Sequence, residues 1–434
     1  MKKILILAII LFAPFIFSQK QKFDVVFKNV NIVSMENDKV ILNQNIAIKD
    51  GKIMVIENAK KSKIRGEKTI DLKGKYIMPS LADAHIHLPE KEEELQHFLE
   101  LNLINGVTKL RSMRGNWQHT AWKEKVNTPT SFYPKLYLSP PPITRDQEPN
   151  IEKMNAYMQA AKNRNFSFIK VLSIKNQDMF QKLDSLCKIY KMPLGGHFPK
   201  LASGNNLNEN VFFNSNYTSI EHLGGLFGAK ELLTERIKNC KEKKMFICPT
   251  LSWYYIGSGK YSLEELPNLT GMQFVKKITL NEWITKTKAY REKLGETAYK
   301  EEVASEMRDM DEKYKIINTL KNEGVKMLLS PDASSSYMMT GCNMVTEMEL
   351  LKKANLTNFE ILQMATANFS DFFKENYGVL KTGKDADFII LDENPLENLQ
   401  TIKQVKGLYY NQLFISETEI TTLKNKLLET TEIK

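Results

Sequence analysis

The chain has 434 residues, of which 42% are hydrophobic and 26% are charged. This composition excludes a disordered chain, a collagen-like rod and a coiled-coil rod, and the length predicts two or three domains or one large barrel with an accessory domain. The formal net charge is +10, but basic and acidic residues are mixed along the chain without a basic stripe between aromatics, so we expect no nucleic-acid partner.

The first residues have the layout of a secretory signal peptide. Lys2 and Lys3 precede an unbroken apolar run from Ile4 to Phe17, and Ser18 is a small residue at a suitable cleavage point. The run is shorter than the roughly 20 apolar residues that a membrane-spanning helix needs. We therefore expect residues 1–18 to be removed and the chain to be exported, periplasmic or secreted, without a stable membrane anchor.

Both ends of the remaining chain are rich in predicted strands. Near the N-terminus, apolar runs occupy residues 23–35, 45–58 and 68–79, and Asp50-Gly51 is a strong signal for a two-residue hairpin turn. Similar runs occupy residues 378–392 and 405–415. We expect residues 19–80 and 375–434 to form one small, composite β-sandwich domain.

The middle of the chain, residues 81–374, alternates eight short apolar runs with helical patterns. Such alternation predicts parallel βα units, and eight of them predict an α/β fold of the (β/α)8 TIM-barrel type. A charged, helical insertion occupies about residues 256–322, and Ser262 and Glu265 form a capping box near its start. This insertion is either a lid over the barrel mouth or a surface decoration.

Polar residues stand at the ends of these predicted strands, where barrels carry their chemistry. His85 and His87, in DAHIHL, point to the same side because they are two residues apart on a strand. An ammonium such as that of Lys170, inside the apolar run FIKVLS, is costly unless it is compensated. The remaining strand-end residues are His197 in GGH, His222 in IEH and Asp332 in LLSPD. Histidines and a carboxylate that converge in this way favour a divalent metal site.

This order of residues resembles the amidohydrolase superfamily over nearly the whole mature chain. GKYIMPSLADAHIHL resembles the entry motif of that family, with Ser80 in place of the usual glycine, and GKDADFIILDENPLENL resembles its closing β-domain motif. The prolidase-like and imidazolonepropionase-like branches are the most similar. Their AGTDA-like eighth-strand end reads LSPDA here, with Asp332 retained.

The resemblance implies a binuclear metal centre of zinc, manganese, cobalt or iron, all of which suit histidine and carboxylate ligands. A hydroxide held between the two metals would attack a carbonyl carbon, and Asp332 would act as general base and then as general acid. The residues that it implies are His85, His87 and Asp332 for one ion, His197 and His222 for the second, and Lys170, carboxylated by carbon dioxide, as the bridge.

The expected reaction is hydrolysis of a C–N amide-type bond in a small molecule, either a dipeptide or an N-acyl amino acid. Two alternatives stay open: a mononuclear hydrolase of cyclic amides with a structural Lys170, and a catalytically silent barrel that binds a ligand. Deaminases of the superfamily carry a glutamate three residues after the fifth-strand histidine, where this chain has Lys200, so we disfavour a deaminase.

Two further points concern the mouth of the barrel and the cysteines. Tyr254 and Tyr255 follow the seventh predicted strand, where they either bind substrate or pack under the insertion.

The four cysteines lack the spacing of a zinc ribbon, and we expect buried free thiols, with a Cys240–Cys248 disulfide as the alternative. Either a monomer or a homo-oligomer is compatible with this sequence.

Overall fold

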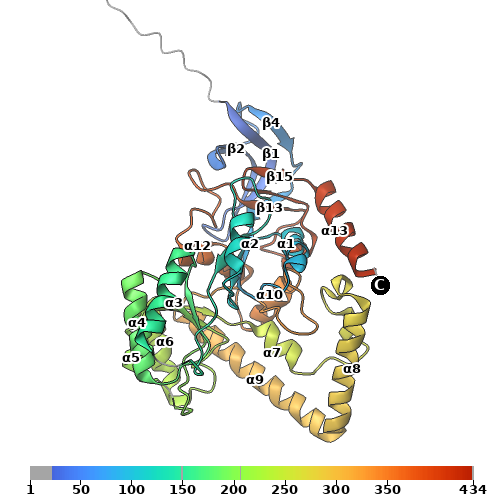
Figure 1. The fold of residues 1–434 in the computed structure, drawn as a ribbon. Coiled ribbons are helices and arrows are strands. Elements are labelled where there is room, and N and C mark those ends of the chain that lie inside the picture. Colours follow the sequence, from blue (N-terminus) through green and yellow to red (C-terminus); the bar gives the residue numbers. More distant parts are fainter. Residues whose placement is uncertain (1–21, 148–149, 206, 433–434) are drawn as a thin grey trace, which may run out of the picture.

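The computed structural model describes residues 22–147, 150–205 and 207–432, which form a mixed α/β fold (Figure 1). The predicted signal peptide, residues 1–18, lies outside these ranges. Within them, no helix is both long and apolar enough to cross a membrane.

The largest sheet has eight strands and combines both ends of the chain, which are rich in strands as expected. Its spatial order is β15-β14-β13-β5-β1-β2-β3, with β4 paired to β1. The strands are β1 (Phe23–Val33), β2 (Val40–Lys49), β3 (Lys52–Asn58), β4 (Gly66–Asp71), β5 (Tyr76–Pro79), β13 (Phe388–Leu391), β14 (Gly407–Tyr410) and β15 (Leu413–Ile415).

Local turn chemistry and aromatic packing explain this sheet. Asp50 and Gly51 have φ angles of 51° and 71°, as a type I′ turn requires, and they join β2 to β3 in an antiparallel hairpin. β13 pairs antiparallel with β5. The ring of Phe27 contacts that of Phe388 edge-on at 5.2 Å between centroids, so both chain ends share one core.

Two smaller sheets are entirely parallel and lie between the strand-rich ends in sequence. One contains β6 (Leu81–Ile86), β7 (Val107–Ser112) and β8 (Lys135–Leu138). The other contains β9 (Ile169–Val171), β10 (Leu194–Gly196), β11 (Tyr217–Glu221) and β12 (Phe246–Cys248). An isolated parallel bridge between Ile143 and Val171 connects the β8 side of the first sheet with β9.

Helices separate these strands along the chain and surround them in space (Figure 1). Their interior faces share the main hydrophobic core with the strands and the connecting loops. The α-helices of this region are α1 (Leu95–Ile104), α2 (His119–Val126), α3 (Ile151–Asn163), α4 (Gln177–Tyr190), α5 (Glu209–Phe213), α6 (Leu233–Glu242), α10 (Met344–Lys353), α11 (Asn358–Met364) and α12 (Ala367–Phe373). The final helix, α13 (Glu417–Glu432), packs against α1.

The eighth predicted strand differs from expectation, because residues 325–330 do not form a regular strand. Met327 makes an isolated parallel bridge with Ile247 of β12. The amide of Ala84 in β6 donates to the carbonyl of Leu329 at 3.1 Å, but the amide of Leu329 turns to Met364. The segment therefore contacts both small sheets. Its backbone hydrogen bonds go to different neighbours from one residue to the next, so no continuous strand pairing forms.

The expected insertion follows α7 (Leu251–Gly257) and contains α8 (Lys277–Leu294) and α9 (Glu296–Asn322), which make a V that projects from the body (Figure 1). Ser262 and Glu265 make the expected reciprocal bonds, but a single 3-10 turn, η3 (Leu266–Asn268), follows them instead of an α-helix. No residue of α8 is buried, whereas α9 buries its C-terminal half.

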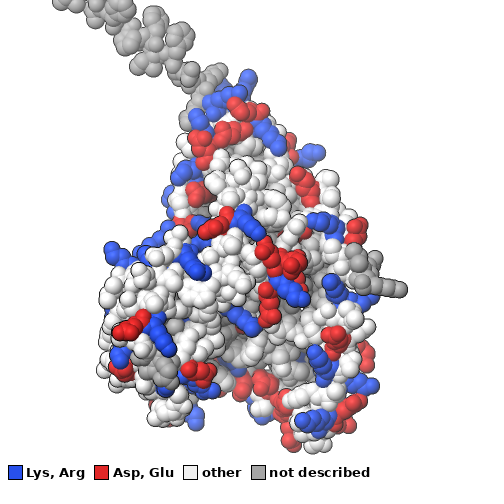
Figure 2. Space-filling model, viewed as in Figure 1, with Lys and Arg blue, Asp and Glu red and all other residues white. Residues whose placement is uncertain are grey.

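The surface and the cysteines agree with two expectations. On the face shown in Figure 2, basic and acidic side chains are interspersed. All four cysteines are buried free thiols, and Cys240 and Cys248 form no disulfide.

Candidate metal centre

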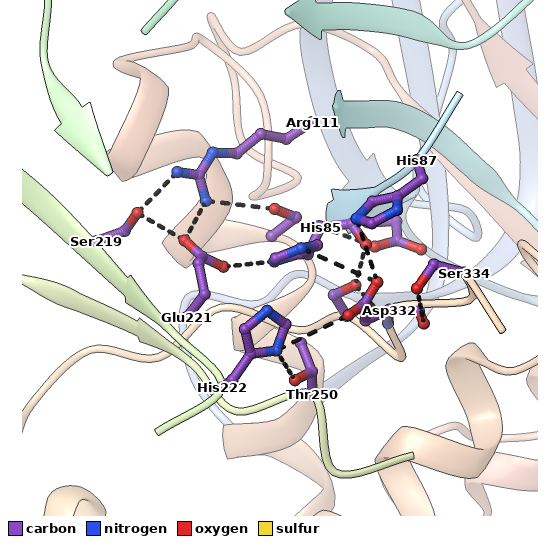
Figure 3. A network of polar contacts seen from close by, with 12 residues as sticks. His85, His87, Arg111, Ser219, Glu221, His222, Thr250, Asp332 and Ser334 are labelled. Carbon is purple, nitrogen blue, oxygen red and sulfur yellow. Dashed lines mark hydrogen bonds and ion pairs between the residues drawn. The ribbon is translucent and has the colours of Figure 1, made fainter. Parts of the chain in front are cut away.

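Three of the expected ligands meet at the end of β6 (Figure 3). The Nε2 atoms of His85 and His87 lie 4.0 and 3.7 Å from Oδ1 of Asp332. The candidate ligand atoms of these three residues all lie within 4.8 Å of one another. Two imidazoles and one carboxylate at this spacing can share a divalent cation.

The residues that follow three of the strand segments have unusual backbone angles. His222, Thr250 and Asp332 have φ angles of 60°, 52° and 51°, in the left-handed region that residues other than glycine seldom adopt. Such residues cost on the order of 1–3 kcal/mol each and cluster at functional sites. The Ser330 hydroxyl helps to hold Asp332, because it accepts from the Asp332 amide at 3.1 Å and donates to the carbonyl of His85 at 2.9 Å.

His222 also lies close to Asp332, and His197 lies beside His222. Nδ1 of His222 lies 2.7 Å from the Thr250 hydroxyl and 3.8 Å from Oδ2 of Asp332. The ring of His222 is 4.6 Å from that of His85 and 5.0 Å from that of His197, measured between centroids. The structure thus gathers all four predicted histidine ligands and Asp332 at one end of the parallel strands.

Burial keeps these imidazoles in the form that binds metals. It lowers the pKa of His87 and of His197 to about 4, and it lowers the pKa values of His85 and His222 well below the ordinary range. The nearby Lys170 charge acts in the same direction on all four rings. Neutral imidazoles offer the lone pair that a metal requires.

Lys170 and Asp332 are shifted toward their uncharged forms. Lys170 lies on β9 beside Gly195 of β10 and is only 1% exposed, and burial lowers its pKa to about 8. Burial raises the pKa of Asp332 to about 6. A lysine with this pKa can present a neutral amine near neutral pH, as carboxylation by carbon dioxide requires.

The sequence predicts that Arg111 is a buried structural arginine and that Glu347 supports a loop, and the structure agrees with both, whereas Glu221 has no predicted role. Burial alone would raise the pKa of Glu221, but the adjacent Arg111 and Lys170 outweigh that effect and lower it. The Arg111 side chain is fully buried and donates to Glu221 at 3.0 Å. In the sequence, Glu221 stands out as a charged residue that ends an apolar run directly before His222. Arg111 stands out as an arginine at the end of another apolar run.

The GGH segment shows why small residues stand beside this network. A Cβ atom on Gly195 would lie 2.8 Å from Nη2 of Arg111 and 2.7 Å from the Ser219 hydroxyl. A Cβ on Gly196, whose φ is 139°, would lie 2.1 Å from the carbonyl oxygen of Val171. The two glycines therefore make room for the guanidinium and for the close approach of β9.

Glu347 supports the loop after β12. Its carboxylate accepts from the backbone amides of Leu251 and Ser252, at 2.8 and 2.7 Å, at the start of α7. The first amides of a helix have no backbone acceptor within the helix, so the Glu347 carboxylate serves as the N-terminal cap of α7. Burial raises the pKa of Glu347 to about 7.

The two tyrosines proposed for substrate binding point in different directions. The Tyr254 hydroxyl donates to the carbonyl of His222 at 2.9 Å, which places it against the ligand cluster. The Tyr255 hydroxyl instead bonds with Lys260 and Lys353. Lys313 of α9 lies 4.4 Å from the ring centroid of Tyr254, so the insertion reaches the edge of the cluster.

The residues present fit a metal ion. Oδ1 of Asp332 is buried, and among the residues that the structure describes it has no hydrogen-bond partner, although it faces two imidazole nitrogens. An orphaned carboxylate oxygen is costly unless a cation or donor satisfies it. Neutral imidazoles beside such an oxygen form a donor set typical of zinc and similar ions.

The sequence of this chain matches one protein-family profile and several characterised proteins. The profile of the Amidohydrolase family matches residues 175–411, more than half of the chain, and this stretch includes His197, His222 and Asp332. The adenine deaminase of Petrotoga mobilis is 28% identical over 195 residues, 42% of this chain and 33% of that protein. The L-hydantoinase of Paenarthrobacter aurescens is 39% identical over 66 residues, 15% of this chain and 14% of that protein. The chain thus spans about a third or less of the length of these relatives.

Solved structures resemble the chain over nearly its whole length. A Xaa-Pro dipeptidase with methionine bound in its active site has a TM-score of 0.66 at 17% identity, and the match covers 90% of this chain and 99% of the dipeptidase. Bottromycin amidohydrolase has a TM-score of 0.71 at 18% identity, with 94% and 91% covered. At such identities the likeness establishes the fold.

Proposed function

Because the chain belongs to the amidohydrolase family, with prolidase-like neighbours in fold, we propose that it hydrolyses a C–N amide-type bond with bound divalent metal. The observation that carries this proposal is the convergence of His85, His87 and Asp332, with ligand atoms within 4.8 Å of one another. The substrate class that we propose is a dipeptide or an N-acyl amino acid, which is supported by the dipeptidase and amidohydrolase neighbours.

We propose the same division of roles that the sequence suggested. A bound divalent metal would supply Lewis acidity and lower the pKa of water. His85, His87 and Asp332 would hold one ion, and His197 and His222 a second, with carboxylated Lys170 between them. Asp332, whose pKa burial raises to about 6, can take up a proton near neutral pH and return it to the leaving nitrogen.

The proposed scaffold is a (β/α)8 barrel. It is supported by the two parallel sheets, by the bridge between Ile143 and Val171, and by the contacts of residues 327–329 with both β12 and β6. In such a barrel the ligands would all stand at the C-terminal ends of the strands. The insertion with α8 and α9 would border that mouth, and we propose that Tyr254 of α7 contacts substrate there.

A second candidate is deamination, which is favoured by the adenine deaminase relative. Against it stands Lys200, which is exposed and occupies the position where a deaminase would carry its glutamate. A mononuclear hydrolase of cyclic amides is the third candidate, and the L-hydantoinase relative favours a cyclic amide as substrate.

One assay separates these candidates. Purified protein is loaded with zinc or with manganese, its metal content is counted, and it is offered dipeptides, N-acyl amino acids, hydantoins and adenine. We expect release of free amino acid from the first two classes and none of it from a His85→Ala/His87→Ala control. Ammonia released from adenine, or ring opening of hydantoins alone, would contradict the proposed substrate class.

We also propose that the chain is exported after removal of residues 1–18. The support is the sequence layout of Lys2, Lys3 and the apolar run from Ile4 to Phe17. N-terminal sequencing of protein from the native host is the test. Recovery of intact Met1 in the membrane fraction would show an anchor instead of a cleaved signal.

A further inference from the structure

Glu221 immediately precedes the expected ligand His222 and is fully buried. One of its oxygens, Oε2, lies 2.8 Å from Nδ1 of His85 on a different strand. The other, Oε1, accepts from Nη1 of Arg111 at 3.0 Å and from the Ser219 hydroxyl at 2.8 Å (Figure 3). Both carboxylate oxygens are thus committed, one to an imidazole and one to a guanidinium.

These contacts exclude Glu221 as a metal ligand in its own right. Candidate ligand atoms of His85, Glu221 and Cys248 also lie within 4.8 Å of one another. However, the fully buried guanidinium of Arg111 already neutralises this carboxylate, and a second cation there would face uncompensated repulsion. The network therefore acts on His85 and does not form a further metal site.

We propose that Glu221 is a positioning residue that selects the tautomer of His85. A neutral imidazole carries one N–H, and a carboxylate beside Nδ1 requires that N–H to be on Nδ1. The lone pair then lies on Nε2, the nitrogen that faces Asp332 at 4.0 Å. This inference rests on the proposed metal site, because the tautomer matters only if His85 is a ligand.

The surrounding residues fix the carboxylate for this role. Ser219 and Glu221 are two residues apart on β11, so their side chains lie on the same face and reach the same guanidinium. Arg111 also donates to the carbonyl of Ala84, the residue before His85. The orientation of His85 thus depends on three strands, β6, β7 and β11. Partners of this kind around metal ligands are typically worth about 10- to 100-fold in metal affinity.

The decisive variant is Glu221→Gln, which keeps the size of the side chain. Its amide oxygen would face the donors of Arg111, so its NH2 group would face Nδ1 of His85 and favour the tautomer with the proton on Nε2. Nitrogen NMR of metal-free protein labelled in its six histidines reads the tautomer directly, and a His85→Gln spectrum identifies the signals of His85. We expect an Nδ1–H signal in the wild type and an Nε2–H signal in Glu221→Gln.

Metal affinity, measured by competition of zinc with a chelator, supplies the second readout. We expect the Kd of Glu221→Gln for zinc to rise about 10- to 100-fold. Glu100→Gln is the matched control, because this buried carboxylate of α1 bonds to the side chains of Gln96 and Lys426 and contacts no expected ligand. It should leave the tautomer of His85 and the zinc Kd unchanged.

Two outcomes would overturn the proposal. An Nδ1–H signal with a wild-type zinc Kd in Glu221→Gln would show that Glu221 only neutralises Arg111. If that variant does not fold, Glu221→Asp is the substitute, because it keeps the negative charge beside Arg111 but moves the carboxylate away from Nδ1 of His85 by the length of one methylene. A wild-type zinc Kd in Glu221→Asp would likewise show that Glu221 only neutralises Arg111. Wild-type protein that binds no metal would instead refute the proposed function, while the tautomer in metal-free protein would still decide the role of Glu221.

Discussion

Asp332 combines two demands at the scale of a single residue. It must be ionised to bind a metal, yet burial raises the pKa of its carboxyl to about 6. Protons therefore compete with metal at a higher pH than at an exposed aspartate. The histidines do not add to this competition near pH 6, because burial already lowers their pKa values below that range.

The first prediction follows from this shift. Zinc affinity should be nearly constant above pH 6 as far as Asp332 is concerned, and below pH 6 it should fall about tenfold per pH unit, since one proton must leave for each ion bound. Asp332→Asn should abolish this step and reduce turnover by roughly 10²-fold or more. Chelator competition between pH 5 and pH 8 measures the affinity. An affinity that is flat down to pH 5 would contradict the prediction.

Lys170 separates the binuclear mechanism from the mononuclear one. Burial lowers the pKa of its amine to about 8, so a neutral fraction is available to form a bond with carbon dioxide and release a proton. Lys170→Met keeps the length of the side chain and removes a buried amine whose charged form is disfavoured by burial.

The second prediction is that Lys170→Met folds as well as the wild type but loses one of two metals and most of its activity. Native mass spectrometry should show the mass of one carbon dioxide on the wild type, more of it at pH 8 than at pH 6, and none on the variant. Equal metal content in both proteins without added mass would support the mononuclear alternative.

At the scale of an element, α8 and α9 differ in how they are attached to the body. Ile317 of α9 is fully buried in the main core, whereas Ile278 of α8 is 68% exposed. Because burial decides the cost of a truncation, the two helices should contribute very differently to stability although both lie in the same charged, helical insertion.

The third prediction compares these two isoleucines. Ile317→Ala should lower the free energy of unfolding by about 2–5 kcal/mol, because it removes buried methyl groups and leaves a cavity. Ile278→Ala should change it by no more than about 0.5 kcal/mol. Urea denaturation with a single probe measures both. Equal costs would show that the exposed face of α8 is covered in solution.

At the scale of the whole molecule, one buried ion pair joins the large sheet to the parallel strands. Lys109 of β7 pairs with Asp387, which stands just before β13, and the ammonium lies 3.7 Å from the ring centroid of Tyr377. Ser80 donates its hydroxyl to the same carboxylate and contacts Thr108. The serine that replaces the usual glycine of the entry motif thus takes part in this junction.

The fourth prediction tests the junction. Asp387→Asn leaves the ammonium of Lys109 buried without a counter-ion and should cost about 3–5 kcal/mol of stability. Metal content per folded chain should stay at its wild-type value, because the pair lies away from the ligand ends of the strands. Thermal unfolding and metal counting on the same sample separate the two effects. Loss of metal without loss of stability would contradict the prediction.

The sequence by itself determined the features that depend on neighbours along the chain. The Asp50-Gly51 turn, the strand-rich ends and the polar residues at strand ends all follow from local dihedral preferences and side-chain periodicity. The same periodicity wrongly predicted a regular eighth strand around Leu329. An apolar run predicts that a segment is buried, but it does not decide whether its backbone forms continuous hydrogen bonds with a neighbouring strand.

Only the tertiary structure decided which polar groups meet. The contact of Glu221 with His85 joins residues 136 positions apart, and that with Arg111 joins residues 110 positions apart. Likewise, Tyr254 faces the ligand cluster and Tyr255 faces two lysines, a choice set by how α7 packs against α9 and α10. Local preferences act over a few residues, whereas these pairings depend on strand order and register, which the packing of the whole chain determines.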